Sequence, residues 1–268
     1  MNFTDKLIVK AGTKVKLEKL DAAETFGYQD DDKTRRKVGK IVARLDDLQY
    51  LLYAEGKRAL LIILQGMDAS GKDGTVRHVM SGVNPQGCQV TAFKVPSAEE
   101  AAHDFLWRSH RAVPEKGMIG IFNRSHYEDV LVVRVHKLVP RQIWKKRFGE
   151  INSFEKLLAD NRVNILKFYL HISSKEQKLR LDARLDDPKK NWKLSPADFA
   201  ERQFWPNYVE AYEDVLSRCS TGYAPWFIIP ADHKWFRNLA ISTIVVETLE
   251  SLDMQFPRPV IVPAKLRS

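Results

Sequence analysis

The sequence predicts an α/β fold built on a parallel sheet of five strands flanked by helices. Three observations support this class. Five short apolar segments alternate with helical segments, the first of them leads directly into a glycine-rich turn, and 44% of the 268 residues are hydrophobic. Alternating strands and helices imply right-handed crossovers and a parallel sheet, whose ligands bind at the carboxyl ends of the strands. The length suits one such domain with insertions or two small domains.

Residues 1–55 are predicted to form an N-terminal extension followed by a helix. Residues 1–32 are mixed and polar, and we expect them to lie on the surface. From Thr34 to about Glu55 the apolar residues recur at helical spacing, and Gly56 then ends the helix. The basic start of this helix, residues 33–40, is typical of a solvated face, with contact to a polyanion as the alternative.

Residues 56–258 are predicted to form the main domain, and residues 259–268 an extended tail. Strands are expected at residues 60–64, 89–93, 118–122, 165–170 and 226–230. Helices are expected at residues 72–82, 97–112, 125–136, 141–160 and 234–252, with a charged helical region at 174–218. Ser97 followed by Glu100 has the spacing of a capping box, which favours the helix start at 97.

The turn after the first strand has the spacing of a P-loop. Gly66 is followed after four residues by Gly71 and Lys72, which gives the pattern G-x-x-x-x-G-K between a strand and a helix. In such a loop backbone N–H groups turn toward phosphate oxygens, the helix N-terminus adds positive potential, and the lysine neutralises charge. The segment therefore predicts a phosphate-binding site.

Two acidic residues distinguish this loop from the usual pattern. The residue after the lysine is Asp73 rather than the Ser or Thr that normally holds Mg²⁺, and Asp68 lies inside the loop. Carboxylates in a phosphate cradle are expected if they hold Mg²⁺, a hard cation that bridges them to substrate phosphates. The alternative for Asp73 is that it complements the dipole of the following helix.

A second polar group follows the third strand. Asn123 comes first, and Arg124 after it can pair with a phosphate through two hydrogen bonds. Ser125 and Glu128 have capping-box spacing, so Glu128 has a structural explanation as well as a functional one. Asp129 is not explained by the cap. His126, between them, is either a donor to phosphate or a packed polar group.

The charged region after the fourth strand predicts a helical lid at about residues 174–205. Arg180 and Arg184 lie four residues apart, so they share one helix face. Arginines on one face of a lid can close on a transferring phosphate and exclude water. The alternative is a helix laced by salt bridges. The aromatic residues that follow at helical spacing are interpreted as core: Phe204, Trp205, Tyr208 and Tyr212.

Charge and cysteine content narrow the class of protein. The net charge of +9 favours a polyanionic partner such as polyphosphate, nucleic acid or an anionic membrane, with simple solubility as the alternative. The two cysteines, Cys88 and Cys219, form no disulfide framework, which favours a reducing compartment. No apolar leader and no bilayer-spanning run are present, so we expect a cytoplasmic protein without a membrane partner. RNA-reading motifs are also absent.

Three segments together resemble the polyphosphate kinase 2 family: Gly66–Gly74, Phe122–Leu131 and Arg184–Lys193. The resemblance covers residues 35–255 and keeps the family's order of motifs. It implies a thymidylate-kinase-like P-loop kinase fold with a helical lid. It also implies Mg²⁺-dependent phosphoryl transfer between inorganic polyphosphate and nucleotides, with Mn²⁺ as a substitute. The pair Glu128-Asp129 resembles the class III subgroup, which converts AMP to ADP and ADP to ATP.

The resemblance also implies roles for individual residues. Asp68, Lys72 and Asp73 correspond to the P-loop groups, Arg124, Glu128 and Asp129 to the second motif, and Arg180 and Arg184 to lid arginines. Asp68 and Asp129 are the expected metal ligands. Contacts to substrate are expected from Gly66, Ala69, Ser70, Gly71, Gly74, Thr75, Arg77, His126, Glu128, Lys189, Lys190 and Lys193. A homodimer or homotetramer is expected.

Two other functions stay open at this point. An ATP-dependent nucleoside monophosphate kinase would share the loop and the lid but use another donor. A non-enzymatic module that binds polyanions or RNA would share the charge but show no turnover. The sequence leaves open the preferred acceptor, adenine against guanine bases, the direction of transfer and the length of the polyphosphate.

Overall fold

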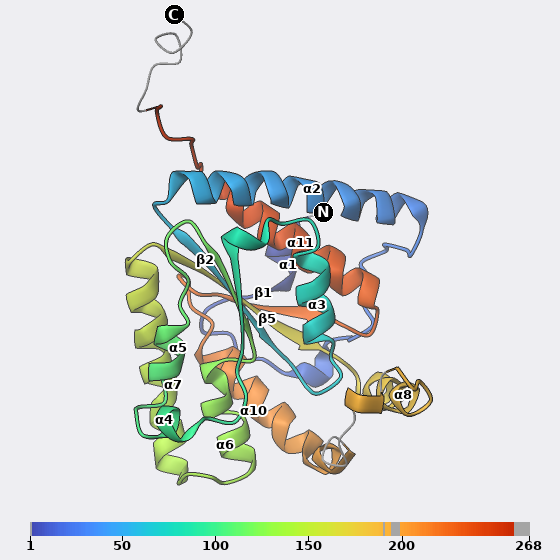
Figure 1. The fold of residues 1–268 in the computed structure, drawn as a ribbon. Coiled ribbons are helices and arrows are strands. Elements are labelled where there is room, and N and C mark those ends of the chain that lie inside the picture. The colour runs from blue at the N-terminus through green and yellow to red at the C-terminus, as the bar shows by residue number, and fades with distance from the viewer. Residues whose placement is uncertain (1, 190, 194–198, 260–268) are drawn as a thin grey trace, which may run out of the picture.

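The computed structural model describes residues 2–189, 191–193 and 199–259 and contains one six-stranded sheet (Figure 1). The strand order is β1-β6-β5-β2-β4-β3, and all strands are parallel except β1, which runs antiparallel to β6. The strands are β1 Ile8–Val9, β2 Ala59–Gln65, β3 Cys88–Ala92, β4 Ile119–Asn123, β5 Val163–His171 and β6 Trp226–Pro230. The predicted α/β class and the five parallel strands are confirmed, and the N-terminal extension adds a sixth.

The central strand β2 carries the P-loop at its carboxyl end. All seven of its residues are buried, because helices cover both faces of the sheet. Leu64 is in register with Asn123 of β4 and with Phe168 of β5. The residues that follow these three strands therefore meet at one edge of the sheet, which is where ligands bind in such folds.

Helices form one layer on each face (Figure 1). One apolar core packs under α2 (Asp32–Glu55), α3 (Lys72–Val79) and α11 (Lys234–Ser251), and the other packs under α7 (Arg141–Asp160) and α10 (Trp205–Arg218). The remaining helices are α1 Phe3–Leu7, η1 Leu17–Lys19, η2 Pro85–Gly87, α4 Ala98–Ala101, α5 Trp107–Arg111, η3 His126–Asp129, α6 Val132–Val135, α8 Ser174–Leu185, η4 Asn191–Lys193 and η5 Glu201–Phe204. No helix in the described ranges is long and apolar enough to span a bilayer.

Two predicted helices are shorter than expected. The capping box of Ser97 and Glu100 forms, but α4 ends after one turn. The Asp104 carboxylate then accepts a hydrogen bond from the Leu106 backbone, a local bond that competes with a continuing helix. The segment predicted as helix 125–136 divides into η3 and α6 at Leu131, whose backbone is not helical.

The N-terminal extension is part of the core, which corrects its prediction as a surface segment. Phe3 is fully buried, and its ring lies 5.7 Å from that of Phe236 in α11. Further along, Val15 and Leu17 enter the opposite core. The extension thus crosses the edge of the sheet and closes both layers, with β1 pairing to β6 on the way.

Replacing Phe3 with Ala is expected to lower the free energy of unfolding by about 3–5 kcal/mol, since a buried ring leaves a cavity. Phe256→Ala is the matched control, because Phe256 is 60% exposed. Urea unfolding followed by circular dichroism measures both variants. Equal unfolding midpoints for the two would show that the extension is only loosely attached.

Candidate active site

The P-loop begins at the end of β2 and closes on the first turn of α3. Gly66 has φ +154°, and a Cβ there would lie 2.9 Å from the Leu170 carbonyl. Ala69 and Gly71 also have positive φ, at +60° and +103°. Ser70 is fully buried, and its Oγ has no hydrogen-bond partner among the described residues. A turn with this backbone aims N–H groups inward, which is the geometry of an anion cradle.

Lys72 is the first residue of α3, and its ammonium lies inside the loop. Its Nζ donates to the carbonyls of Gly66 at 2.6 Å and Met67 at 3.2 Å. Burial and, after it, the nearby Arg124 guanidinium lower the pKa of Lys72 to about 8, although the charges of Asp68 and Glu128 oppose the shift. A buried ammonium interacts strongly with a bound anion, because little water screens the two charges.

Two buried arginines support the loop from below. Arg180 of α8 donates to the carbonyls of Ala69 at 3.0 Å and Ser70 at 2.9 Å, and to those of Ala231 and Asp232 beyond β6. Arg237 of α11 also donates to Ser70, at 3.2 Å. Burial, followed by the charge of Arg180, lowers the pKa of Arg237 to about 10. The two guanidinium groups fix the loop carbonyls outward, so its N–H groups can face a ligand.

The position of Arg180 corrects its prediction as a lid arginine. Its hydrogen-bond partners among the described residues are four backbone carbonyls and the Glu176 carboxylate, which leaves no donor directed at a substrate. Arg184, one turn later on the same helix, is partly exposed. Gln177 of α8 also donates to the Asp68 carbonyl at 3.0 Å. The base of α8 is thus fixed to the P-loop, and closure of residues 174–205 as a lid stays a prediction.

The two acidic side chains of the loop are hydrogen-bonded to side chains of the second motif. Asp68 accepts from Arg124 at 2.9 Å, and Asp73 accepts from Asn123 at 2.8 Å. Arg124 has φ +62°, which turns its side chain toward the loop. Burial raises the pKa of the Glu128 carboxyl, while the charges of Arg124 and Lys72 oppose the rise. A phosphate in this place would meet Lys72 and Arg124 and leave Asp68 available to a cation.

A cavity of about 380 Å³ opens next to Asp68, Arg124 and Glu128. Three aromatic side chains of α10 also line it: Trp205, Tyr208 and Tyr212. Tyr212 is buried in the core as predicted, and Trp205 and Tyr208 are partly buried and pack against the same core while also bordering the cavity. The rest of the wall comes from Gly66, Met67, Val95, Val132, His136, Gln177, Glu201 and Arg202. The cavity combines a charged end with an aromatic wall, which suits a nucleotide.

Two residues of the second motif point away from this cavity. Asp129 accepts from Arg147 at 3.0 Å and lies 3.9 Å from Arg108. His126 is fully buried, with its Nε2 3.3 Å from Oε1 of Glu155. The predicted pairing of Asp68 with Asp129 is therefore not formed, because the side chain of Asp129 leaves η3 on the side facing α7. Sequence spacing does not show on which side of a short 3₁₀ turn a side chain emerges.

The other predicted residues vary in position. Gly74 and Thr75 lie in α3 behind the loop, and Thr75 donates to the Gly71 carbonyl at 3.1 Å. Arg77 and Lys189 are exposed and border no part of the cavity. Lys190 and the side chain of Lys193 lie outside the described residues. Arg237, Arg202 and the aromatic wall were not predicted as functional. Arg237 could have been noticed from the sequence only as an arginine within the otherwise largely apolar helix α11.

The acidic residues at the loop match the way Mg²⁺ is usually held. Among the described residues, no group of three or more His, Cys, Asp or Glu side chains could hold a metal ion. Mg²⁺ commonly needs only one or two carboxylates, because substrate phosphates and waters complete its shell. Asp68 and Glu128 both border the cavity and provide such oxygens, whereas Asp129 does not border it. The donor set fits a cation shared with phosphate.

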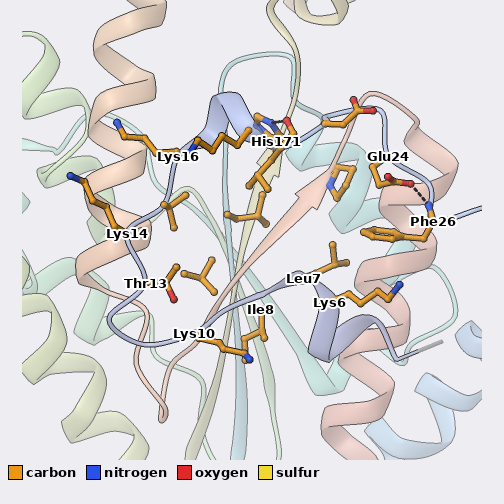
Figure 2. A pocket seen from close by; sticks show the side chains of 17 residues that line it. Lys6, Leu7, Ile8, Lys10, Thr13, Lys14, Lys16, Glu24, Phe26 and His171 are labelled. Atoms are coloured by element: carbon orange, nitrogen blue, oxygen red, sulfur yellow. Dashed lines mark hydrogen bonds between the residues drawn. The ribbon is translucent and has the colours of Figure 1, made fainter.

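A larger cavity, of about 730 Å³, lies at the β1 edge of the sheet (Figure 2). Lysines of the N-terminal extension surround it, with Lys6 beside Phe26 and Lys14 and Lys16 at the other end. Lys10 and Lys19 also border it. Its charge suits anionic groups, but none of the predicted site residues lies there. Strands β6 and β5 separate β1 from β2, the strand that leads into the P-loop.

The comparison with known proteins agrees with this site. The family model for polyphosphate kinase 2 (PPK2) matches residues 28–257. The chain belongs to the polyphosphate kinase 2 family. The match includes the P-loop, the second motif and α8, which together surround the cavity. Family membership makes the chain a phosphotransferase and removes the non-enzymatic alternative.

Individual relatives are similar over nearly their whole length. The AMP/ADP-polyphosphate phosphotransferase of Meiothermus ruber is 50% identical over 95% of this chain and 96% of its own. The ADP-polyphosphate phosphotransferase of Rhodopseudomonas palustris is 47% identical over 95% of this chain and 92% of its own. The crystal structure of polyphosphate kinase 2 from Arthrobacter aurescens TC1 superposes with a TM-score of 0.93 at 42% identity, covering 97% of this chain and 93% of that one.

Proposed function

We propose that the chain transfers phosphoryl groups between inorganic polyphosphate and the nucleotides AMP and ADP, with Mg²⁺. One observation carries the proposal: the P-loop cradle opens directly into a cavity with a charged end and an aromatic wall. The names of the relatives from Meiothermus ruber and Rhodopseudomonas palustris support the same substrates. Adenine nucleotides are the proposed acceptors, with guanine nucleotides as the alternative.

The donor is assigned to the P-loop and the acceptor to the cavity. The terminal phosphate of the polyphosphate lies over the loop with Lys72, and the acceptor phosphate lies near Arg124. The acceptor oxygen is already anionic, so no strong base is needed, and positioning with charge neutralisation carries most of the rate. Arg124 is held by Asp68 at 2.9 Å, and an entering phosphate replaces that carboxylate as its partner. Asp68 then becomes available to a cation.

Asp68 is the proposed metal ligand, with Glu128 in place of Asp129 as the second carboxylate, and Mn²⁺ as a substitute for Mg²⁺. When bound, the cation neutralises charge on the transferring phosphate. Asp73 supports the loop through Asn123, since that amide donates to its carboxylate. We further propose that the protein forms a homo-oligomer. We also propose a reducing, cytoplasmic compartment, because both cysteines are free thiols.

The aromatic wall is expected to bind the base of the acceptor. Trp205→Ala should raise the KM for AMP and ADP about tenfold, because stacking on an aromatic side chain contributes about 1–3 kcal/mol per base. The KM for polyphosphate should stay unchanged. Trp107→Ala is the control, since Trp107 stacks on His103 and borders no part of the cavity. Steady-state kinetics with each substrate varied in turn would refute the assignment if Trp205→Ala left the nucleotide KM unaltered.

Product analysis distinguishes the proposed donor and acceptors from their rivals. Protein, Mg²⁺ and AMP or ADP are incubated with long-chain polyphosphate or with ATP, and the nucleotides are separated by chromatography. ADP and ATP formed from AMP with polyphosphate alone are the expected result. Product from ADP only would withdraw the monophosphate acceptor. Transfer from ATP but never from polyphosphate would favour the ordinary nucleoside monophosphate kinases.

A further inference from the structure

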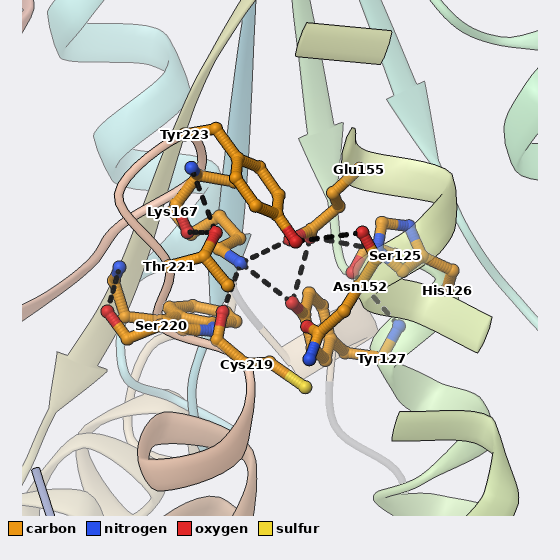
Figure 3. A network of polar contacts seen from close by, with 12 residues as sticks. Ser125, His126, Tyr127, Asn152, Glu155, Lys167, Cys219, Ser220, Thr221 and Tyr223 are labelled. Carbon is orange, nitrogen blue, oxygen red and sulfur yellow. Dashed lines mark hydrogen bonds and ion pairs between the residues drawn. The ribbon is translucent and has the colours of Figure 1, made fainter. Parts of the chain in front are cut away.

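A buried polar network lies behind the second motif, on the side away from the cavity (Figure 3). Lys167 in the middle of β5 is fully buried. Its Nζ donates to Oε2 of Glu155 at 2.5 Å, to the hydroxyl of Tyr127 at 2.9 Å and to the carbonyl of Cys219 at 2.6 Å. All three ammonium hydrogens are therefore used, and none of these groups borders the cavity.

Glu155 of α7 links this lysine to two consecutive residues of η3. Its Oε1 accepts from the hydroxyl of Tyr127 at 2.8 Å and lies 3.3 Å from Nε2 of His126. Burial opposes ionisation of this carboxyl, but the charge of Lys167 and the hydrogen bond with His126 outweigh it and lower the pKa of Glu155. A charged carboxylate is the stronger acceptor, so both side chains are held firmly.

The anchored residues lie between the two that reach the cavity. Arg124 precedes them and Glu128 follows, while Ser125 connects the segment to the P-loop strand. The Oγ of Ser125 accepts from Nε2 of Gln65 at 3.1 Å and from the Tyr127 backbone at 3.2 Å. Gln65 is the last residue of β2 and immediately precedes Gly66. A continuous chain of hydrogen bonds thus joins β5, α7, η3 and the start of the P-loop.

The backbone of this segment needs such support. Arg124 has φ +62°, a conformation that costs a non-glycine residue about 1–3 kcal/mol and persists only where the surroundings fix it. Its N–H donates to the Leu64 carbonyl at 3.0 Å. The side chains of His126 and Tyr127 hold the chain on the other side of the bend. Without them the segment is free to relax away from the loop.

We propose that Glu155 and Lys167 are positioning residues, which act through Tyr127 and His126 to hold Arg124 and Glu128 against the P-loop. The proposal rests on the proposed function, because it requires Arg124 and Glu128 to contact the substrates. A buried ion pair is weak support for a role in stability, since an apolar pair of similar volume is often equally stable. Here the pair offers hydrogen bonds in fixed directions, which an apolar pair lacks.

The double variant Glu155→Met/Lys167→Met tests this directly. Either single variant leaves a buried charge and is expected to unfold at lower temperature. The double variant removes both charges, so its melting temperature should recover, but kcat should stay about 10–100-fold below wild type because the catalytic groups are displaced. Tyr127→Phe keeps the ring and loses only the bridging hydroxyl, and kcat should again fall more than the melting temperature.

The control is an ion pair at the amino end of β2, the end away from the P-loop. Arg58 contacts Glu55 at 2.8 Å, and neither borders the cavity. Glu55→Met/Arg58→Met should change the melting temperature but leave kcat within about twofold of wild type, since this largely buried pair shares no partners with the groups at the cavity. Turnover of the wild type is measured first. A wild type without turnover would refute the proposed function, whereas the variants test the positioning role.

Two results would overturn the positioning role. Wild-type kcat in the double variant would show that the network serves folding alone. The network would also serve folding alone if kcat fell in proportion to the loss of melting temperature in the control and in the network variants alike. If the double variant does not fold, Tyr127→Phe decides: a wild-type kcat would refute the proposal, and a lowered kcat at an unchanged melting temperature would support it.

Discussion

Lys72→Met is expected to lower kcat/KM with polyphosphate by about 10²–10³-fold, which is the usual effect of removing one charged donor from a transition state. The ammonium lies inside the loop, where it donates to the carbonyls of Gly66 and Met67. Methionine fills a similar volume without charge, so the fold should persist. Initial rates of nucleotide formation and a thermal melt measure the two effects. Near-normal turnover would refute the role of Lys72.

The pH dependence of the wild type gives a second test of this lysine. The pKa of Lys72 lies near 8, below its ordinary value, because burial disfavours the charged form. The ammonium is the form that attracts the donor, so kcat/KM for polyphosphate should fall as pH rises through about 8. A bound polyanion favours the charged lysine, and kcat itself should therefore decline only at higher pH. A pH-independent kcat/KM between pH 7 and 9 would contradict this.

Arg180→Lys is expected to lower both the free energy of unfolding and kcat. The guanidinium of Arg180 donates to four backbone carbonyls in two directions, and a lysine ammonium offers three donors without the planar fork. A buried carbonyl left unsatisfied costs about 1–3 kcal/mol. The free energy of unfolding should fall by at least that amount, and kcat should fall about tenfold or more as the P-loop loses its shape.

The matched control for this change is Arg44→Lys on α2. Arg44 is half-exposed and contacts Glu250 at 2.8 Å, so its replacement should alter the free energy of unfolding by less than about 0.5 kcal/mol. Urea unfolding and initial rates are measured for both variants. If Arg180→Lys behaved like the control, the P-loop would not depend on this guanidinium.

The sequence predicts those features that local residues determine. The strand and the glycine positions around Lys72 lie within one short segment, so the P-loop is predicted in place. The parallel strands follow from continuous apolar runs with turns between them. Strand β1 has only two residues, Ile8 and Val9, and no periodicity can reveal so short a strand. It forms because the buried Phe3 fixes the extension at the edge of the sheet.

Contacts between distant segments are what the sequence could not give. Arg180 donates to loop carbonyls that lie 110 and 111 residues away in the sequence, and Arg237 of the last helix donates to one that lies 167 residues away. Helical spacing shows that Arg180 and Arg184 share a face but not what that face contacts. The same limit applies to His126 and Asp129, whose partners belong to α7. The packing of these elements is needed to tell which of these residues face the cavity and which serve the structure.

Transfer of a radioactive label shows whether the protein moves phosphoryl groups from polyphosphate to a nucleotide. Long-chain polyphosphate labelled with ³²P is incubated with unlabelled AMP, Mg²⁺ and the protein, and nucleotides are separated from orthophosphate. Label is expected in ADP and ATP, at a rate that Lys72→Met lowers by about 10²–10³-fold. Label released only as orthophosphate, or none in nucleotide, would contradict phosphoryl transfer from polyphosphate to the acceptor in the cavity beside Arg124 and Glu128.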